Sequence, residues 1–277
     1  MGRTPQAARG CLQVIWIVKL KNNMESSKYI IFLDIDGTVF DGESVPEKNV
    51  LALKRAREEG HKIFLNTGRA HCIVTDDIIE AVKPDGIISA MGTSIFVGDT
   101  PIFSAVMNEA DVEYLLKYGD DHDIFTIIES VEKLVSLKGP SFMGQDNFLD
   151  RAEDLRKLYP DMRISKISLM SDVDDVDVEL FRTMFPLVYK HPNFTEIPPE
   201  GCNKATAIKR VCDYYGIDTA HTIAMGDSGN DYDMVKYAGI GVAMGNATDA
   251  IKSVADFITV DCAEGGVAYA LEKILWS

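Results

Sequence analysis

Residues 29–38, which decide the fold, read YIIFLDIDGT. The uninterrupted apolar run Tyr29–Leu33 has the length of a strand and is typical of a strand covered on both faces. Asp34 and Asp36 follow it, and Gly37 indicates a turn. Side chains two positions apart in a strand share a face, so we expect the two carboxylates to lie close together. They then repel each other unless a cation or a proton intervenes. An ordinary Asp-Gly turn is the plain alternative.

Short apolar runs alternate with amphipathic stretches on either side of a different middle region. This alternation is typical of βαβ units around a parallel sheet. Further strands are predicted at Lys62–Leu65, His221–Met225, Ile240–Ala243 and Phe257–Val260. Helices are predicted between Pro46 and Gly60, at Lys204–Tyr215, up to Ala238 and at Gly266–Leu275. The pattern therefore predicts an α/β fold.

The middle of the chain departs from this spacing. Residues 87–197 mix strand and helix signals, and the turn-rich segments Pro84–Gly86 and Pro198–Gly201 bound them. We interpret residues 87–197 as a second α/β domain, inserted into a core that is formed by residues 24–86 and 198–277.

The first 23 residues differ from the rest. Arg3 and Arg9 precede an apolar run, Cys11–Val18, which lacks the small-residue cleavage pattern of a signal peptide. The run is also far shorter than the ~20 residues that span a bilayer. We expect residues 1–23 to be a disordered extension or an artefactual start, with Met24 as the alternative first residue.

Charge and cysteine usage restrict the partners and the compartment. The 277 residues include 28 Lys plus Arg and 43 Asp plus Glu, which gives a formal net charge of −15. An acidic surface does not attract nucleic acid or anionic membranes, so we expect neither as a partner. Five cysteines occur without a CxxC pair, which favours reduced thiols and a cytoplasmic location over disulfides or a zinc site.

Two segments offer groups that suit an anion. Thr67 and Gly68 follow the strand predicted at Lys62–Leu65 and bring a hydroxyl and a backbone N–H close to a predicted helix start. Lys204 begins its predicted helix, where a cation opposes the helix dipole, so a ligand explains it better than local stability does. The plain alternatives are a helix N-cap for Thr67 and an exposed lysine for Lys204.

A third segment adds carboxylates. Asp227 comes just after a predicted strand, and Asn230 and Asp231 lie at the next helix start, where an acidic residue is also an ordinary cap. Because the strand ends of an open parallel sheet converge on one crevice, we expect Asp34, Asp36 and Asp227 to meet there. Oxygen ligands without a His or Cys cluster favour Mg²⁺ over zinc.

These groups together predict a site for phosphoryl transfer. A cation and Lys204 neutralise phosphate oxygens, and Thr67 donates a hydrogen bond. One of the two carboxylates Asp34 and Asp36 attacks phosphorus as a nucleophile. The other protonates the leaving alcohol and later helps to activate water.

Four motifs, taken in order, resemble those of the haloacid dehalogenase-like (HAD) phosphatases. They are Asp34–Thr38, Thr67–Arg69, Lys204 and Gly226–Asp231. The insertion after the second motif and the segment Val242–Ala247 resemble the Cof-type, sugar-phosphatase-like branch. The resemblance covers residues 28–275. It implies a Rossmann-like parallel-sheet core and an inserted α/β cap domain, residues 87–197, that closes over the core and selects the leaving group.

The resemblance also implies a role for each residue. Asp34 is the expected nucleophile, which forms an aspartyl-phosphate, and Asp36 is the expected acid/base. Mg²⁺ is expected on the carboxylates of Asp34 and Asp227 and on the backbone carbonyl of Asp36, with Asp231 in support. The expected phosphate-binding residues are Thr67, Gly68 and Lys204, and Asn230 is expected to contact phosphate or substrate.

Two positions depart from the family pattern. Met91-Gly92 stands where an Asn-Gly pair is often found, which puts a cap-hinge contact with substrate in question. Asn66 stands where a small apolar residue often precedes the second motif. Its amide could add a polar contact or only cap a turn, and we favour the turn.

We therefore predict a cytoplasmic, Mg²⁺-dependent phosphatase that hydrolyses a small phosphorylated metabolite, such as a sugar phosphate, through an aspartyl-phosphate. Two alternatives share this scaffold. One is a phosphomutase, which returns the phosphoryl group to a sugar. The other is a non-catalytic regulator that binds a phosphorylated metabolite. The sequence predicts no oligomeric state.

Overall fold

The computed structural model describes residues 28–171 and 173–277. The segment 1–23, predicted as an extension or artefactual start, lies outside the described residues. The described chain divides into two compact units. The first unit contains residues 28–64, 80–84 and 212–277, and the second unit contains residues 65–79 and 85–211.

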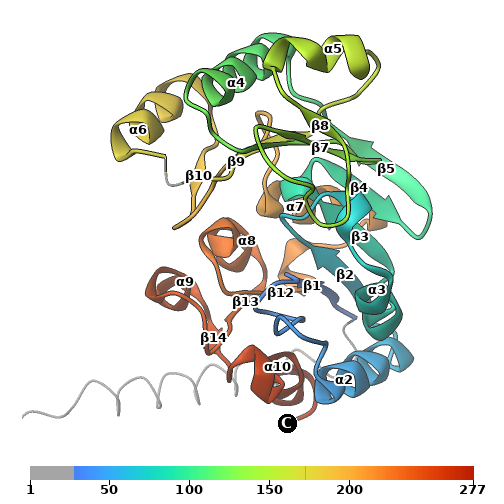
Figure 1. Ribbon diagram of the computed structural model, residues 1–277. Helices are drawn as coiled ribbons and strands as arrows, with labels where there is room; N and C mark the ends of the chain where they lie inside the picture. The colour runs from blue at the N-terminus through green and yellow to red at the C-terminus, as the bar shows by residue number, and fades with distance from the viewer. Residues whose placement is uncertain (1–27, 172) are drawn as a thin grey trace, which may run out of the picture. The chain divides into compact units, whose positions relative to one another are not determined.

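A parallel sheet forms the centre of the first unit (Figure 1). Its order is β14 (Phe257–Ile258), β13 (Ile240–Ala243), β12 (Thr222–Gly226), β1 (Ile30–Leu33) and then β2 (Lys62–Asn66), whose last two residues belong to the second unit. All four residues of β1 are buried, as expected for an apolar strand that is covered on both faces. The predicted α/β class is confirmed.

Helices cover this sheet. The first unit contains α2 (Glu47–Glu58), α8 (Tyr232–Tyr237), α9 (Asp249–Val254) and α10 (Gly266–Leu275), together with the 3₁₀ turns η4 (Thr219–His221), η5 (Gly229–Asp231) and η6 (Cys262–Glu264). Helix α2 begins after Pro46, whose fixed φ suits a helix start. It lies beside α10 (Figure 1), where Asn49 Oδ1 accepts a hydrogen bond from Ala268 N at 3.0 Å. Helix α9 was not predicted.

The second unit contains two sheet regions. Beside the end of β2, the strands β3 (Gly86–Ser89), β4 (Ser94–Val97) and β5 (Thr100–Ser104) follow in order, with the antiparallel pairs β3–β4 and β4–β5. Short helical segments lie close to them in sequence: η1 (His71–Ile73), α3 (Asp76–Val82) and η2 (Ala90–Gly92). Helix α7 (Lys204–Tyr215) begins in this unit.

The other region is a six-stranded sheet with mostly antiparallel pairing. Its strand order is β10 (Tyr189–Lys190), β11 (Thr195–Ile197), β9 (Lys166–Leu169), β6 (Thr126–Glu129), β7 (Leu134–Leu137) and β8 (Phe148–Leu149). Three helices lie along one face of it (Figure 1): α4 (Glu109–Asp121), α5 (Leu155–Leu158) and α6 (Asp175–Met184). The 3₁₀ turn η3 (Ala152–Asp154) precedes α5.

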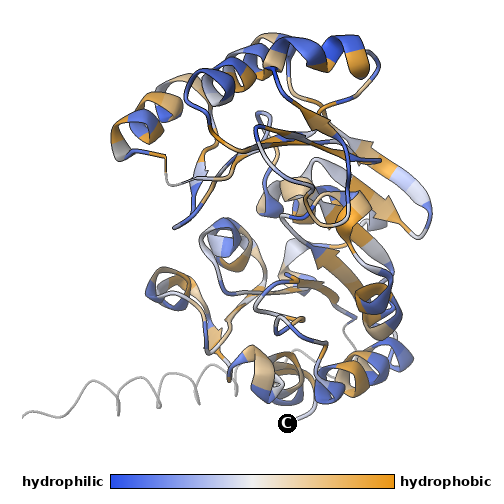
Figure 2. Ribbon diagram, viewed as in Figure 1, coloured by the Kyte–Doolittle hydropathy of each residue, from blue (hydrophilic) through white to orange (hydrophobic). Residues whose placement is uncertain are grey.

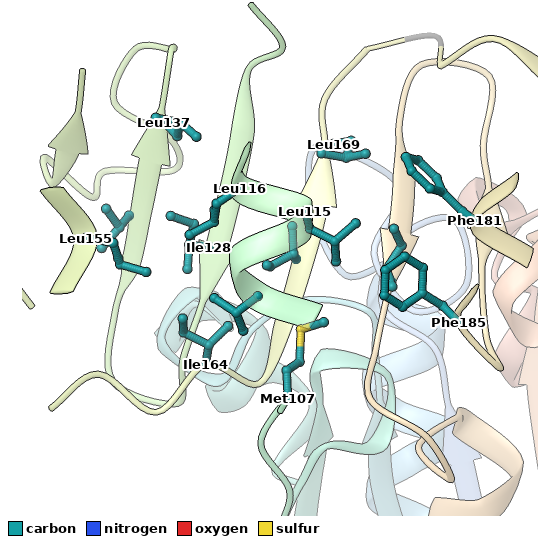
Figure 3. Packing of buried hydrophobic residues seen from close by; sticks show 14 of the residues in the cluster. Met107, Leu115, Leu116, Ile128, Leu137, Leu155, Ile164, Leu169, Phe181 and Phe185 are labelled. Carbon is teal, nitrogen blue, oxygen red and sulfur yellow. The ribbon is translucent and has the colours of Figure 1, made fainter. Parts of the chain in front are cut away.

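A hydrophobic core fills the space between these helices and the six-stranded sheet. Figure 3 shows Leu115 and Leu116 of α4 packed beside Ile128, with Phe181 and Phe185 at one side. Figure 2 shows both hydrophobic and hydrophilic residues along these helices, and Val112, Leu155 and Val178 are among those that belong to the core. Because side chains alternate along a strand, the opposite face of the sheet receives another set of residues. It includes the buried polar residues Glu129, Lys166, Ser168 and Glu196.

The two compact units do not divide at the predicted domain boundaries, because residues 65–79 and 198–211 belong to the second unit. The assignment of residues 87–197 as an inserted cap stays a prediction. Within the described ranges, every helix is too short or too polar to span a membrane.

Candidate active site

The segment after β1 is a tight turn. The strand ends at Leu33, and Ile35 O then accepts hydrogen bonds from the backbone N–H groups of Thr38, Val39 and Phe40. Asp34 is buried, whereas Asp36 is exposed. The expectation that both aspartates share one face of a strand was therefore wrong in its geometry, because neither lies in the strand. The turn gives the two carboxylates different environments.

Asp227 packs against this turn. Thr38 Oγ1 donates a hydrogen bond to Asp227 Oδ1 at 3.2 Å. Gly37 has a φ of +78°, and a Cβ at this position would lie 2.6 Å from Asp227 Oδ2. Glycine is required there on two counts, because an L side chain would be strained and would collide with the carboxylate.

Asp231 organises the loop that carries Asp227. Its Oδ2 accepts hydrogen bonds from Asp227 N at 3.0 Å and from Ser228 N at 2.9 Å. The Ser228 hydroxyl also donates to Asn230 Oδ1 at 3.0 Å. Ser228 and Asp231 form a capping box at the start of η5. Asp231 is therefore a helix cap, which was the plain alternative for this residue. It also fixes the backbone of Asp227.

Three carboxylates meet at this place. The side chains of Asp34, Asp227 and Asp231 each offer an oxygen, and these oxygens all lie within 4.8 Å of one another. The expected group was Asp34, Asp36 and Asp227, so Asp231 stands in the place of Asp36, which is exposed on the turn. Asp34 and Asp231 are buried and Asp227 is half-buried. Closely spaced carboxylates repel unless a cation lies between them, and oxygen donors suit a hard divalent ion. The residues thus fit a divalent metal site.

Two residues to which the sequence assigned no role support the turn. Asn246 Nδ2 donates to Gly37 O at 2.8 Å, and Asn246 Oδ1 accepts from Cys262 N at 2.9 Å. Cys262 Sγ donates to Thr38 O at 3.0 Å. Burial, and then the charges of Asp41, Asp227 and Asp34, raise the pKa of the Cys262 thiol to about 12. The thiol therefore stays protonated and acts as a hydrogen-bond donor.

The Thr67–Gly68 segment lies in the second unit and forms a loop. Thr67 is buried, its N–H donates to Ile88 O at 2.9 Å, and its Oγ1 accepts a hydrogen bond from Arg69 N at 3.1 Å. Helical segments follow this loop, first the 3₁₀ turn η1 at His71 and then α3. The plain N-cap alternative for Thr67 was wrong, because the residue before η1 is Ala70.

Lys204 begins α7, as predicted, and its side chain is buried. Asn66 Nδ2 donates to Lys204 O at 3.0 Å, which links the start of α7 to the end of β2. The favoured interpretation of Asn66 as a turn cap was therefore wrong, because the amide makes a buried long-range contact. This contact places the second and third motifs next to each other.

Met91 and Gly92, the pair that departs from the family pattern, both have backbone angles in the left-handed region. Met91 has φ 60° and ψ 34°, and its N–H donates to Thr67 O at 3.1 Å. Gly92 has a φ of +83°, and a Cβ there would lie 2.6 Å from Asn203 O. Asparagine tolerates the left-handed region better than methionine does. Met91 therefore adopts a backbone conformation that is costly for its residue type.

The parallel sheet and the carboxylates that follow its neighbouring strands β1 and β12 define an α/β enzyme with an acidic active site. The chain belongs to the haloacid dehalogenase-like hydrolases, whose family model matches residues 31–271. The predicted family is confirmed, and with it the prediction that the chain is an enzyme of this hydrolase class.

Several relatives cover nearly the whole of this chain. It is 30% identical over 250 residues to YkrA of Bacillus subtilis (strain 168), whose name assigns it provisionally as a phosphatase, with 88% of this chain and 97% of YkrA covered. It is 25% identical to the 5-amino-6-(5-phospho-D-ribitylamino)uracil phosphatase YitU of the same organism, with 90% and 98% covered. The structure of the HAD phosphatase BT1666 from Bacteroides thetaiotaomicron matches with a TM-score of 0.78 at 26% identity, with 90% and 96% covered.

Proposed function

We propose that this protein is a Mg²⁺-dependent phosphatase that hydrolyses a small phosphorylated metabolite through an aspartyl-phosphate on Asp34. The observation that carries the proposal is the group of three carboxylates, Asp34, Asp227 and Asp231, with their oxygens within 4.8 Å of one another. The name of YitU, which is similar over nearly its whole length, supports a phosphorylated small molecule as the substrate class.

Asp34 is the nucleophile in this proposal. Its carboxylate oxygen attacks phosphorus, a P–O bond to Asp34 forms, and the bond to the leaving alcohol breaks. Asp34 suits this role because it directly follows β1, is buried, and is held by a hydrogen bond from its own N–H to Met225 O at 3.1 Å. The strand before it and this hydrogen bond limit the movement of the backbone that carries the attacking carboxylate.

Asp36 supplies and removes protons. It donates a proton to the departing alkoxide in the first step. In the second step, it accepts a proton from the water that attacks the aspartyl-phosphate, which releases inorganic phosphate and restores Asp34. Its exposed position on the turn suits contact with an incoming substrate. The opposite environments of Asp34 and Asp36 support two different roles for the pair.

Thr67, Gly68 and Lys204 bind the phosphate oxygens in this proposal. Lys204 contributes a positive charge, Thr67 a hydroxyl and Gly68 a backbone N–H. Asn230 contacts phosphate or substrate from the loop after β12. The contact between Asn66 and Lys204 supports this assignment, because it joins the two segments that carry these groups.

The carboxylates of Asp34 and Asp227 and the backbone carbonyl of Asp36 would hold Mg²⁺, with Asp231 in support. When bound, the ion offsets negative charge on the carboxylates and the phosphate, so that one anion can attack another. The chain's part is to hold these oxygens together, which the bonds from Asp231 to the Asp227 loop achieve.

Residues 87–197 act as the cap that selects the leaving group in this proposal. We also place the protein in the cytoplasm. Among the described residues, the four cysteines Cys72, Cys202, Cys212 and Cys262 form no disulfide, which is compatible with a reducing compartment.

Phosphate release from a panel of phosphorylated metabolites and from an aryl phosphate, with and without Mg²⁺, tests the proposal. We expect Asp34→Asn to lose at least ~10³-fold in kcat, since the nucleophile is removed. Asp41→Asn is the matched control, because Asp41 belongs to the same segment but only caps a turn through Glu43 N and Ser44 N. Turnover retained in Asp34→Asn would contradict the covalent step. An isomeric sugar phosphate as product would instead indicate a mutase, and tight binding without turnover would indicate a regulator.

A further inference from the structure

Lys166 is a buried lysine that contacts the Thr67–Gly68 loop. It lies on β9, in the six-stranded sheet, and its side chain is 3% exposed. Its Nζ donates to Gly68 O at 2.7 Å. The same ammonium pairs with Glu129 Oε1 at 3.2 Å and hydrogen-bonds Glu196 Oε1. An ammonium has three N–H donors, so these three acceptors match its full capacity.

The two glutamates hold Lys166 from both neighbouring strands. Glu129 lies directly opposite Lys166 on β6, and Glu196 lies on β11, the strand on the other side of β9. Ser168 Oγ donates to Glu129 Oε1 at 2.7 Å, and His191 Nε2 lies 3.0 Å from Glu196 Oε2. Each carboxylate is therefore fixed by a second partner, which limits the positions that the ammonium can adopt.

Burial and the neighbouring charges act in opposite directions within this cluster. Burial, and to a lesser extent the charge of Glu196, raise the pKa of Glu129 against the opposing attraction of Lys166. Burial opposes a charged Lys166, but the attraction of Glu129 and Glu196 outweighs it and raises the pKa of the ammonium. Burial also opposes a charged Glu196, yet Lys166 and His191 outweigh it and lower the pKa of that carboxyl. Lys166 and Glu196 are thus a charged pair in the folded protein, and removing the cation would leave buried carboxylates without their partner.

The Gly68 carbonyl belongs to the same peptide unit as Arg69 N. A trans peptide is planar, so its C=O and N–H point in opposite directions and move as one body. Arg69 N donates to Thr67 Oγ1 at 3.1 Å. Lys166 on one side and the Thr67 hydroxyl on the other are therefore joined through a single rigid peptide.

The two flanking carbonyls of the loop are held by backbone groups. Met91 N donates to Thr67 O, and Ala90 N donates to Arg69 O at 2.6 Å. Gly68 O, between them, accepts from the side chain of Lys166. With Arg69 N donating to it, the Thr67 oxygen acts as an acceptor toward the loop, and its own proton is directed elsewhere. The Gly68–Arg69 peptide thus occupies one lone pair of the Thr67 oxygen, which leaves the hydroxyl proton for another acceptor.

We propose that Lys166 is a positioning residue for phosphate binding, which acts through the Gly68–Arg69 peptide on the hydroxyl of Thr67. The inference rests on the proposed function, because it gives Thr67 and Gly68 the task of holding a phosphate. In this inference, residues 87–197 contribute to phosphate binding as well as to selection of the leaving group.

A double-mutant cycle between Lys166 and Thr67 tests this. The four proteins are wild type, Lys166→Met, Thr67→Val and the double variant. Calorimetry measures their affinity for inorganic phosphate in the presence of Mg²⁺. The kcat and KM of each protein for an aryl phosphate are measured as well. We expect Lys166→Met to weaken phosphate binding about tenfold when Thr67 is present and less than about twofold in the Thr67→Val background. Equal losses in both backgrounds would overturn the proposal, because a general structural effect is additive.

Variants of the cluster control for stability. Lys166→Met combined with Glu129→Gln and Glu196→Gln removes the unpaired charges and should fold even where the single variant does not. It should reproduce the loss of phosphate affinity. Arg156→Met removes an ion-pairing cation of the same unit, whose partner is Glu109, and should leave phosphate binding unchanged. If neither Lys166 variant folds, the cluster is structural and the positioning role is overturned.

Phosphate binding also separates the two proposals. If wild type binds phosphate but turns over no substrate, the proposed function fails, while the cycle still decides the role of Lys166. If wild type binds no phosphate, both are overturned. Retained phosphate affinity in Lys166→Met with a rise in KM for the aryl phosphate alone would contradict the proposal, because it would assign Lys166 to the leaving group.

Discussion

The carboxylate of Asp231 accepts a hydrogen bond from the backbone N–H of Asp227 at 3.0 Å. One acidic side chain thereby fixes the loop that carries another, four residues earlier. The same Oδ2 accepts from Ser228 N, and a Cβ on Gly226 would lie 2.5 Å from Asp231 Cβ. The backbone of this loop is therefore built around the Asp231 side chain, which reaches the carboxylate cluster only because Gly226 leaves the space.

Removing the Asp231 carboxylate should weaken metal binding. In Asp231→Ala the Asp227 loop loses two hydrogen bonds and the cluster loses a charge, so we expect Mg²⁺ affinity to fall ~10 to 100-fold. Stability should fall by about 1–3 kcal/mol, because the half-buried N–H groups of Asp227 and Ser228 lose their acceptor. Mg²⁺ titration by calorimetry and thermal unfolding check this. The exposed Asp249, an ordinary first-turn acid of α9, is the control, and Asp249→Ala should leave Mg²⁺ affinity unchanged.

Substitutions of two glycines in the turn after β1 distinguish the effect of backbone strain from that of a steric clash with Asp227. Gly37→Ala and Gly42→Ala both place an L side chain at positive φ, +78° and +101°, but only the Cβ at Gly37 meets another group within 4 Å. We expect both variants to lose stability, by roughly 1–2 kcal/mol, and only Gly37→Ala to lose phosphatase activity. Thermal unfolding and phosphate release distinguish the two effects. Equal activity in the two variants would contradict the role of the Gly37 contact with Asp227.

Loss of Asp36 should depend on the leaving group. In Asp36→Asn no proton is supplied to the departing oxygen, which matters for an alkoxide and little for a nitrophenolate. We expect kcat/KM for an alkyl phosphate to fall ~10² to 10⁴-fold and that for nitrophenyl phosphate to fall much less. kcat/KM is the correct measure because it reports the first irreversible step. An equal fall for both substrates would remove Asp36 from the acid role.

Stability should decrease on mild acidification through His61. Its Nδ1 accepts a hydrogen bond from Tyr29 N at 3.0 Å, which requires the neutral ring. Burial, and then the charge of Lys28, lower the pKa of His61 below the usual value of 6.5. The unfolded state therefore binds more protons below pH 6.5, so the free energy of unfolding falls as the pH drops from about 7 to 5.

In His61→Gln the free energy of unfolding should depend less on pH. The control His122→Gln should keep the wild-type dependence, because His122 is exposed. Urea unfolding at pH 7, 6 and 5 measures the slopes. If His61 instead made the free energy of unfolding rise as the pH falls, the folded state would favour the charged ring. That result would contradict the hydrogen bond from Tyr29 N to the neutral ring.

Elements with a strong apolar pattern could be predicted from the sequence with close bounds. The predicted ranges of α7, β13 and α10 agree with the structure, because a run of buried residues or a helical period is a local property. Helix α9 was missed because six residues carry too little periodicity. The first residue of the helix that follows Thr67 could not be predicted, because a strand-turn-helix pattern does not specify how long the turn is.

The candidate site was predictable in its residue types and less so in its geometry. Asp34, Asp227 and Asp231 could be identified because each follows a strand or begins a helix. The separate environments of Asp34 and Asp36 could not, because they depend on a turn closed by three hydrogen bonds to Ile35 O. Asn246 lies in the segment Val242–Ala247 that resembles the Cof-type branch, but neither its role nor that of Cys262 could be predicted. Their partners Gly37 and Thr38 lie more than 200 residues away.

The sequence by itself determined the α/β class, the order of the four motifs and the chemical groups that they carry, because these follow from short runs of residues. Only the tertiary structure decided which groups touch. Asp227 packs on Gly37 and is bound by Thr38 across 189 positions, and Lys166 reaches Gly68 across 98. Such contacts depend on strand order and register, which bring distant segments together at distances that no local pattern encodes.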